Sequence, residues 1–279
     1  MKNIVYCLFT FISLSIMSCH DNDIIQSDEN CESDTIADTE IPLKYKVSTI
    51  YSIADNFRMD FEYNEQGKVS KVYEVSPKFN RTTEMIYKYD TLNNCIYSHI
   101  KQRQEYIEVS ETTDFERTDT IYIKNGVAES CSGMLVSYLP NSFEKAYYIN
   151  FDYDNEKRLT HMLLRQPRFS DQHYYLEWEN DNIVRTMEPC NVECIYEYYS
   201  SPAMPSFYTQ PHPLYIHHAP LIEEGVFGKK SCNLLYRKKE SGGCDWTTYQ
   251  YGFVDDKVDF IEIKYDTAYI SNLRISWSF

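Results

Sequence analysis

The chain has 279 residues, and 42 acidic against 27 basic side chains give a formal net charge of −15. This balance argues against nucleic acid as a partner, because phosphates need a basic stripe and the sequence has none. Tyrosine is abundant at 26 residues, whereas glycine is sparse at 8, and apolar residues rarely keep a helical spacing for long. These features predict a strand-rich chain.

The first 18 residues have the features of an export signal. Lys2 precedes an apolar run from Ile4 to Met17, which is too short to span a bilayer as a helix. The run ends at the sequence IMSC, which resembles the bacterial lipobox, although Met17 is bulkier than the usual residue there. The resemblance implies cleavage before Cys19 and attachment of a diacylglycerol to its thiol. An ordinary secretory signal with an incidental cysteine is the alternative.

Residues 19–42 are expected to be an acidic, disordered tether between lipid and folded domain. Residues 20–42 hold eight carboxylates and no Lys or Arg, so the segment repels itself and lacks a core. Acidic residues soon after the lipid-bearing cysteine resemble the export signal of Bacteroides-type surface lipoproteins. Display at the cell surface and a periplasmic orientation both remain open. The Asp–Thr–aliphatic sequence at Thr35 resembles the Bacteroides-type O-glycosylation acceptor.

A repeated phrase runs through residues 43–279, which we expect to form a single all-β domain. Each copy has aromatic residues two apart, then an acidic or amide-rich tip, then an aliphatic run. Residues two apart share one face of a strand, and tips such as NEQG carry turn chemistry. The phrase therefore predicts a β-hairpin with aromatic rings on its inner face. Copies begin at Phe61, Tyr87, Phe151, Leu176 and Tyr249.

The copies resemble YD (Rhs-type) hairpins, in which an aromatic–x–aromatic–Asp strand turns and returns as an aliphatic strand. Because one hairpin is only marginally stable, the copies must stack edge to edge. The resemblance implies an antiparallel meander that forms a curled sheet or partly closed barrel. Together with the lipobox, the chain resembles Bacteroides-type envelope lipoproteins of a family of unknown function. The aromatic phrase describes construction and carries no information on a substrate.

Two segments depart from the repeat. Residues 200–230 carry prolines that cannot donate to a central ladder, so a long crossing loop or an edge is expected. The loop holds His212, His217 and His218, for which solvated side chains are favoured over a zinc or copper site. The tail alternates large apolar residues up to Phe279 and resembles the closing strand of outer-membrane barrels. Charges on both faces of most strands favour a strand outside the bilayer instead.

The cysteine count fits an oxidising compartment. Without the leader and Cys19, seven cysteines remain, and Cys31 in the tether is the natural unpaired one. Two disulfides are favoured, Cys190–Cys194 around a short tip and Cys232–Cys244. A zinc site is disfavoured because there is no C-x-x-C pair, and free buried thiols remain an alternative.

The leading function hypothesis is a non-enzymatic binding or scaffold module anchored in the outer membrane through its N-terminal lipid. A glycan is the expected ligand class, an envelope protein is the other possible partner, and neither a metal nor another cofactor is expected. Trp246, in a glycine-containing loop, is the candidate ring for stacking on a sugar. The alternative is an envelope hydrolase acting on polysaccharide or peptide, for which a convergent carboxylate pair in a deep pocket would be the sign.

Overall fold

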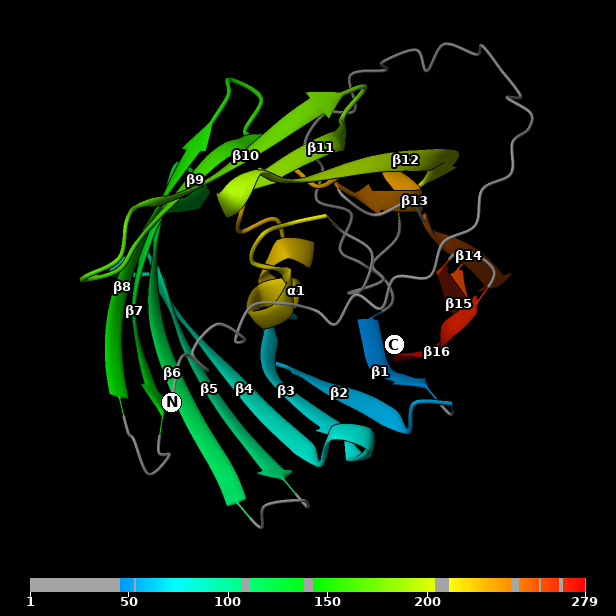
Figure 1. Cartoon of the computed structure of the whole chain (residues 1–279), viewed down its shortest axis with the longest axis horizontal. Coiled ribbons are helices and arrows are strands. Elements are labelled where there is room, and N and C mark those ends of the chain that lie inside the picture. The colour runs from blue at the N-terminus through cyan, green and yellow to red at the C-terminus, as the bar shows by residue number, and fades with distance from the viewer. Residues whose placement is uncertain are drawn as a thin grey trace, which may run out of the picture.

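The structure is a computed structural model, and it describes residues 46–52, 54–106, 111–137, 143–203, 211–241, 246–255, 257–265 and 268–278. Within these ranges, sixteen strands form one closed antiparallel barrel (Figure 1). Every strand pairs with its neighbours in sequence, and β1 pairs with β16 to close the ring. This confirms the expected all-β meander, with a barrel that is fully closed.

The strands differ in length, and the longest lie in the first half of the barrel. Their bounds are β1 Lys46–Ser52, β2 Phe57–Tyr63, β3 Val69–Ser76, β4 Arg81–Asp90, β5 Cys95–Tyr106, β6 Glu111–Lys124, β7 Val127–Ser137, β8 Phe143–Tyr153, β9 Leu159–Arg165, β10 Gln172–Glu179, β11 Asn182–Glu188, β12 Val192–Pro202, β13 Asn233–Glu240, β14 Thr247–Val254, β15 Lys257–Tyr265 and β16 Ala268–Ser278. Two 3₁₀ turns, η1 Pro77–Phe79 and η2 Pro189–Asn191, and one helix, α1 Tyr215–Glu223, complete the described elements.

Each copy of the aromatic phrase forms a hairpin, as the sequence predicts. In the β2–β3 hairpin, the Asn64 side-chain oxygen accepts hydrogen bonds from the backbone N–H groups of Gln66 and Lys68, both at 3.0 Å. Gly67 follows with φ +79°, a conformation that glycine adopts without a Cβ clash. Side-chain bonding by Asn64 and backbone freedom at Gly67 together fix this turn.

The second aromatic residue of the phrase has a recurring role that explains the repeat. Its ring packs against the core, and its O–H or N–H donates to the backbone carbonyl of a buried aliphatic residue on the preceding strand. Both its polar atom and a buried carbonyl are thereby satisfied. Six such bonds lie in the described residues: Tyr63 to Val47 (2.8 Å), Tyr89 to Val69 (2.9 Å), Trp178 to Leu159 (2.8 Å), Tyr198 to Ile183 (2.6 Å), Tyr251 to Leu235 (2.9 Å) and Trp277 to Val258 (3.0 Å).

The two ends of the described chain complete the pattern. β16 supplies the aromatic strand through Trp277, and β1 supplies the aliphatic strand through Val47, which accepts the bond from Tyr63. The strands pair with Ile50 opposite Ile275, and both side chains are fully buried or nearly so. The β16–β1 pair therefore acts as one more hairpin without a covalent turn, and it closes the barrel.

The outer wall of the barrel is polar. Register places Asp60, Tyr73, Glu84, Lys101 and Glu116 in one outward row across β2 to β6. Ion pairs cross this wall, including Lys71–Glu84 at 2.7 Å and Arg274–Asp259 at 2.7 Å. Charged side chains and their ion pairs therefore line part of the outward face of the barrel. Among the described residues, no helix is both long and apolar enough to cross a membrane.

Residues 211–230, the described part of the proline-rich segment after β12, lie inside the barrel (Figure 1), so the expectation of a crossing loop or edge is wrong for these residues. Helix α1 of this segment lies inside the ring of strands, with Pro220 within it and a kink at His218. Pro202 is the last residue of β12, whereas residues 211–230 lie outside the sheet. Burial of Leu221 and Phe227 draws these residues into the core.

The residues after α1 are bonded to the hairpin ends. Val69 N–H donates to Glu224 Oε1 at 2.7 Å, and Ala128 N–H donates to the Val226 carbonyl at 2.7 Å. Gly228 has φ +92°, and a Cβ there would lie 2.4 Å from the Lys157 carbonyl oxygen. We call residues 211–230, which include α1, the plug. Glycine is required at position 228, where the plug passes the β8–β9 turn.

Candidate functional site

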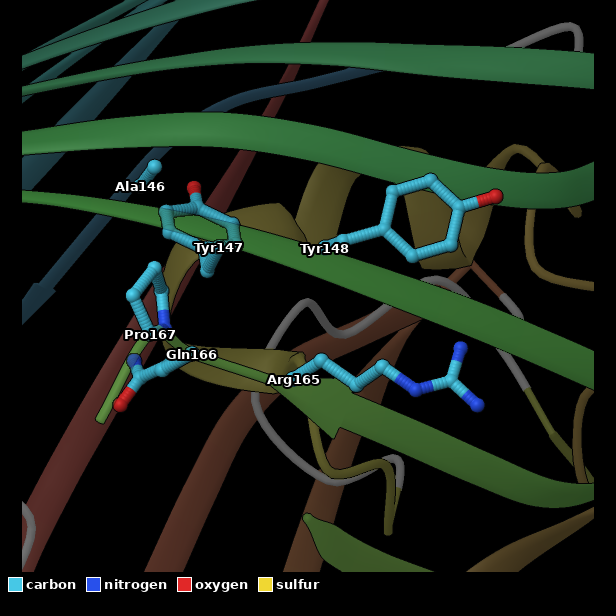
Figure 2. A pocket seen from close by; sticks show the side chains of 6 residues that line it. All are labelled: Ala146, Tyr147, Tyr148, Arg165, Gln166 and Pro167. Carbon is cyan, nitrogen blue, oxygen red and sulfur yellow. The ribbon is translucent and has the colours of Figure 1, made fainter. Parts of the chain in front are cut away.

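A cleft opens in the barrel wall where β8 extends past the end of β9. The β8–β9 pairing begins at Tyr148 opposite Arg165, so the earlier residues of β8 have no β9 partner. The cleft has a volume of about 360 Å³. Figure 2 shows its six lining side chains, which are Ala146, Tyr147 and Tyr148 from β8 and Arg165, Gln166 and Pro167 from the end of β9.

The outward rim of the cleft carries an aromatic ring and a cation side by side. Tyr148 is 38% exposed, and its hydroxyl accepts a hydrogen bond from Asn150 Nδ2 at 3.3 Å. Arg165 Nη1 donates to Asn150 Oδ1 at 2.9 Å, and its Nε lies 3.4 Å from Asp171 Oδ2. Asn150 thus holds the ring and the guanidinium together, while the Arg165 side chain remains 49% exposed. The rim offers a flat ring beside a guanidinium that is paired with the Asp171 carboxylate.

The lining residues carry two tyrosine rings, a guanidinium and an amide. None of the six residues is a carboxylic acid, histidine, serine or cysteine. Glycoside hydrolysis ordinarily uses two carboxylates, and peptide hydrolysis uses an activated nucleophile or a metal. Neither arrangement is found among the six lining residues. What the cleft does supply is stacking, a cation and hydrogen-bonding amides.

Behind the cleft, Tyr147 connects to a buried polar network. Tyr147 lies on the inner face of β8, and its hydroxyl donates to Asp119 Oδ1 on β6. Arg117 Nε donates to Asp119 Oδ2 at 2.9 Å, and His218 Nε2 of α1 lies 3.1 Å from the same oxygen. The Asp119 side chain is 0% exposed and the His218 side chain 1%. Two strands of the wall are thereby joined to the plug through one carboxylate.

Gly133 makes this connection possible. Register aligns Asp119 of β6, Gly133 of β7 and Tyr147 of β8 in one inward row. A Cβ at Gly133 would lie 2.3 Å from the Tyr147 hydroxyl oxygen and 2.4 Å from Asp119 Oδ1. The tyrosine ring therefore crosses the strand at its one residue without a side chain, in order to reach the carboxylate.

The charges of the network follow from its burial. Burial alone would raise the pKa of Asp119, but the Arg117 cation and the bond to His218 outweigh it and hold the pKa below the ordinary value. Burial lowers the pKa of His218, although Asp119 opposes this effect. Asp119 is therefore ionised and paired with Arg117, while His218 is neutral. Its Nδ1 is buried without a hydrogen-bond partner.

The histidines of the proline-rich segment do not face solvent as the sequence suggested. His218 is in the buried network, and the His212 ring packs on Phe227 with centroids 5.5 Å apart. Burial lowers the pKa of His212 to about 3. The His217 side chain lies outside the described residues. In the part of the chain that the structure describes, no group of three or more His, Cys, Asp or Glu side chains is arranged to hold a metal ion.

Trp246 keeps its place as a candidate stacking residue. Its ring lies beside β13, where the Arg237 guanidinium stands over it at 4.2 Å and Lys239 Nζ at 5.9 Å. Arg237 is also bonded to Glu197, with Nε 2.8 Å from Oε2. One cation already covers part of the ring, and a sugar at Trp246 would have to share or displace it.

The cysteines give the predicted disulfides no support. Cys194 is present as a thiol, and the side chain of its predicted partner Cys190 lies outside the described residues, as does Cys244. The Cys232 sulfur lies 2.8 Å from Asn233 Oδ1. Both pairings stay predictions.

Two more cysteines are buried thiols on opposite faces of the wall. Cys131 faces inward beside Ile121, whereas Cys95 lies outward beneath the Tyr97 and Tyr122 side chains. Cys19, Cys31 and Thr35 lie outside the described residues, so lipidation and glycosylation also stay predictions.

Comparisons with known proteins identify a fold. No family model matches the sequence, and no curated protein matches it. A porin-like protein from Bacteroides uniformis ATCC 8492 aligns with a TM-score of 0.51 and 12% identity, over 83% of this chain and 96% of that chain. A porin-like protein from Bacteroides vulgatus ATCC 8482 aligns with a TM-score of 0.39 and 12% identity, over 82% and 97%. The likeness to the first is one of fold alone.

One sequence feature indicates the buried network. In ERTDT, Arg117 and Asp119 are two apart, between Phe115 and Ile121 on the same strand face. Two charges on an otherwise apolar face indicate a paired, buried site. The cleft had no such signal, because it results from the unequal lengths of β8 and β9.

Proposed function

We propose that this protein is a non-enzymatic binding module of the bacterial outer membrane, tethered by a lipid on Cys19, and that it binds an acidic glycan at the wall cleft. The observation that carries the proposal is the pairing of the exposed Tyr148 ring with the Arg165 guanidinium at the rim. A tyrosine face matches the apolar face of a sugar ring, and arginine binds carboxylate or sulfate groups through paired N–H donors.

The polar outer wall supports a tethered rather than an embedded barrel. Ion pairs such as Lys71–Glu84 on the outside would be costly in hydrocarbon, whereas a lipid at the end of a tether leaves the wall in water. The wall cleft would then be open to a polymer in the surrounding medium.

The test is glycan-array binding by the full mature chain, with Tyr148→Ala and Arg165→Ala. Both variants should lose at least tenfold in affinity for acidic glycans, and neutral glycans should be insensitive to Arg165→Ala. Tyr73→Ala is the matched control, because Tyr73 is an equally exposed tyrosine on β3 at 42%. Melting temperatures should match, since all three side chains are at the surface.

Two outcomes would contradict the proposal. Binding that Trp246→Ala abolishes and Tyr148→Ala leaves intact would move the site to β13–β14. A full chain that binds no glycan on the array would reject the ligand class. Intact-mass analysis tests the anchor separately, because a mature chain that begins at a residue other than Cys19 and carries no lipid would remove it.

A further inference from the structure

A separate group of side chains lies on the outer wall across β8, β9 and β10. His161 Nδ1 lies 2.8 Å from Asp152 Oδ2, and His161 Nε2 lies 3.0 Å from His173 Nδ1. Asp152 is directly opposite His161 on the neighbouring strand, and His173 is displaced by two positions on the other side. Three strands thus place a carboxylate and two imidazoles in a continuous line.

A nitrogen of one imidazole points at a nitrogen of the other. Their planes are only 19° apart with centroids separated by 5.2 Å, a geometry that fits an in-plane contact between nitrogens. His161 Nδ1–H donates a hydrogen bond to the Asp152 carboxylate, and in this tautomer the lone pair of His161 is on Nε2. A carboxylate on the far nitrogen is also the usual partner of a metal-bound histidine, because it fixes the tautomer and raises the basicity of the ligand.

We propose that His161 and His173 form a binding site for a divalent transition-metal ion, Zn²⁺ or Cu²⁺, in which the ion replaces the proton shared between the two rings. Metal–nitrogen bonds are about 2.0–2.1 Å, so nitrogens 3.0 Å apart subtend roughly 91–97° at such an ion. Neighbouring ligands of a tetragonal ion have this angle. The ion lies off the line between the two nitrogens, so both rings turn on binding to point their lone pairs at it.

The surroundings hold the ligands in place and leave room for the rest of the coordination shell. The Tyr175 ring lies nearly parallel to both imidazoles, with centroids 4.8 Å from His161 and 6.1 Å from His173. This packing restricts rotation of the His161 side chain, which is 21% exposed, whereas the Asp152 side chain is 67% exposed. Water therefore completes the site, and two protein ligands predict micromolar rather than tighter affinity.

Titration calorimetry tests the site on the full mature chain after chelator treatment, with Cu²⁺ and Zn²⁺ used separately as the metal alone. His161→Ala and His173→Ala should each weaken one binding event at least tenfold. Asp152→Asn should weaken the same event about tenfold, since a carboxylate that hydrogen-bonds a metal-bound histidine changes metal affinity by roughly 10–100-fold. His99→Ala is the matched control, because His99 is an outer-wall histidine that pairs with Glu116 and has no second imidazole in contact.

A spectroscopic readout separates this site from thiols or the chain terminus. The electron paramagnetic resonance spectrum of the Cu²⁺ form should show coupling to two imidazole nitrogens, reduced to one in His173→Ala. His173→Gln repeats the test with a polar side chain of similar size, and the melting curve of each variant verifies folding. Unchanged binding in both histidine variants, or no binding event in the wild type at 1 mM metal, overturns the proposal.

Discussion

Removal of single hydroxyl groups tests whether the repeated aromatic hydrogen bonds stabilise the barrel. In Tyr63→Phe the ring stays, and only the O–H that donates to the Val47 carbonyl at 2.8 Å is lost. Tyr153 occupies the equivalent place on β8, but its hydroxyl is buried and has no hydrogen-bond partner among the residues that the structure describes. Tyr153→Phe is therefore a matched control that removes the same atom from the same position of the repeat.

The expected changes in the free energy of unfolding differ between the two variants in sign as well as in size. Loss of the Tyr63 hydroxyl leaves the carbonyl of the buried Val47 without this donor, which costs about 1–2 kcal/mol. Loss of the Tyr153 hydroxyl removes a buried polar group that makes no bond, so it should be neutral or stabilising by up to about 1 kcal/mol. Burial already raises the pKa of both phenols well above the ordinary value, so neither ionises in the assay range.

Urea unfolding at pH 7.5, followed by circular dichroism, gives the comparison. Tyr63→Phe should lower the urea midpoint and Tyr153→Phe should leave it level or raise it, with the slope of each transition unchanged. For a domain of this size, the loss at Tyr63 corresponds to about 2–4 °C in melting temperature for each kcal/mol. Equal losses in the two variants would show that the rings alone matter and would refute the role given to the hydrogen bond.

Three further predictions concern the interior. Asp119→Asn should cost about 3–5 kcal/mol in urea unfolding, because the Arg117 cation is left buried without its anion. Gly133→Ala should cost about 1–3 kcal/mol and should shift the near-ultraviolet signal, since the new methyl group displaces Tyr147. Burial lowers the pKa of His212 to about 3, so below about pH 6.5 the unfolded chain binds a proton that the folded chain does not. Stability should therefore fall by about 1.4 kcal/mol per pH unit between pH 6 and pH 4 from this group alone, and His212→Asn should remove that part of the slope.

The hairpins were predictable because their signals are local. Aromatic spacing and turn residues such as Gly67 lie within one stretch of about fifteen residues, and each stretch forms the expected pair of strands. The sequence did not predict whether the strands close into a ring, because it allowed both a curled sheet and a partly closed barrel. Closure depends on Ile50 meeting Ile275 across the whole chain, and no local pattern specifies such a contact.

The position of the plug was not predictable for a different reason. The prolines indicate that a segment leaves the sheet, but they do not indicate on which side of the sheet residues 211–230 lie. That choice depends on the space inside the ring, which side chains such as Phe151 and Phe227 fill together with centroids 5.3 Å apart. The buried histidines follow from this choice, and a surface loop would have left them solvated.

The buried carboxylate of Asp119 distinguishes the correct register of β8 from a shifted one, which the apolar core does not. Side chains alternate between the faces of a strand with a period of two, so a shift of β8 by two residues keeps its apolar residues inward. Such a shift would move Tyr147 away from Gly133 and Asp119, and it would place the Tyr147 ring opposite Cys131 or Leu135 of β7, which have a Cβ where Gly133 has none. The same carboxylate must also meet His218, so a misplaced plug removes a second partner. The ion pair with Arg117 lies within β6 and survives both errors, but the carboxylate loses a hydrogen-bond donor in each. Because a buried polar group that loses its partner costs about 1–3 kcal/mol, the network favours one register of the wall and one position of the plug together.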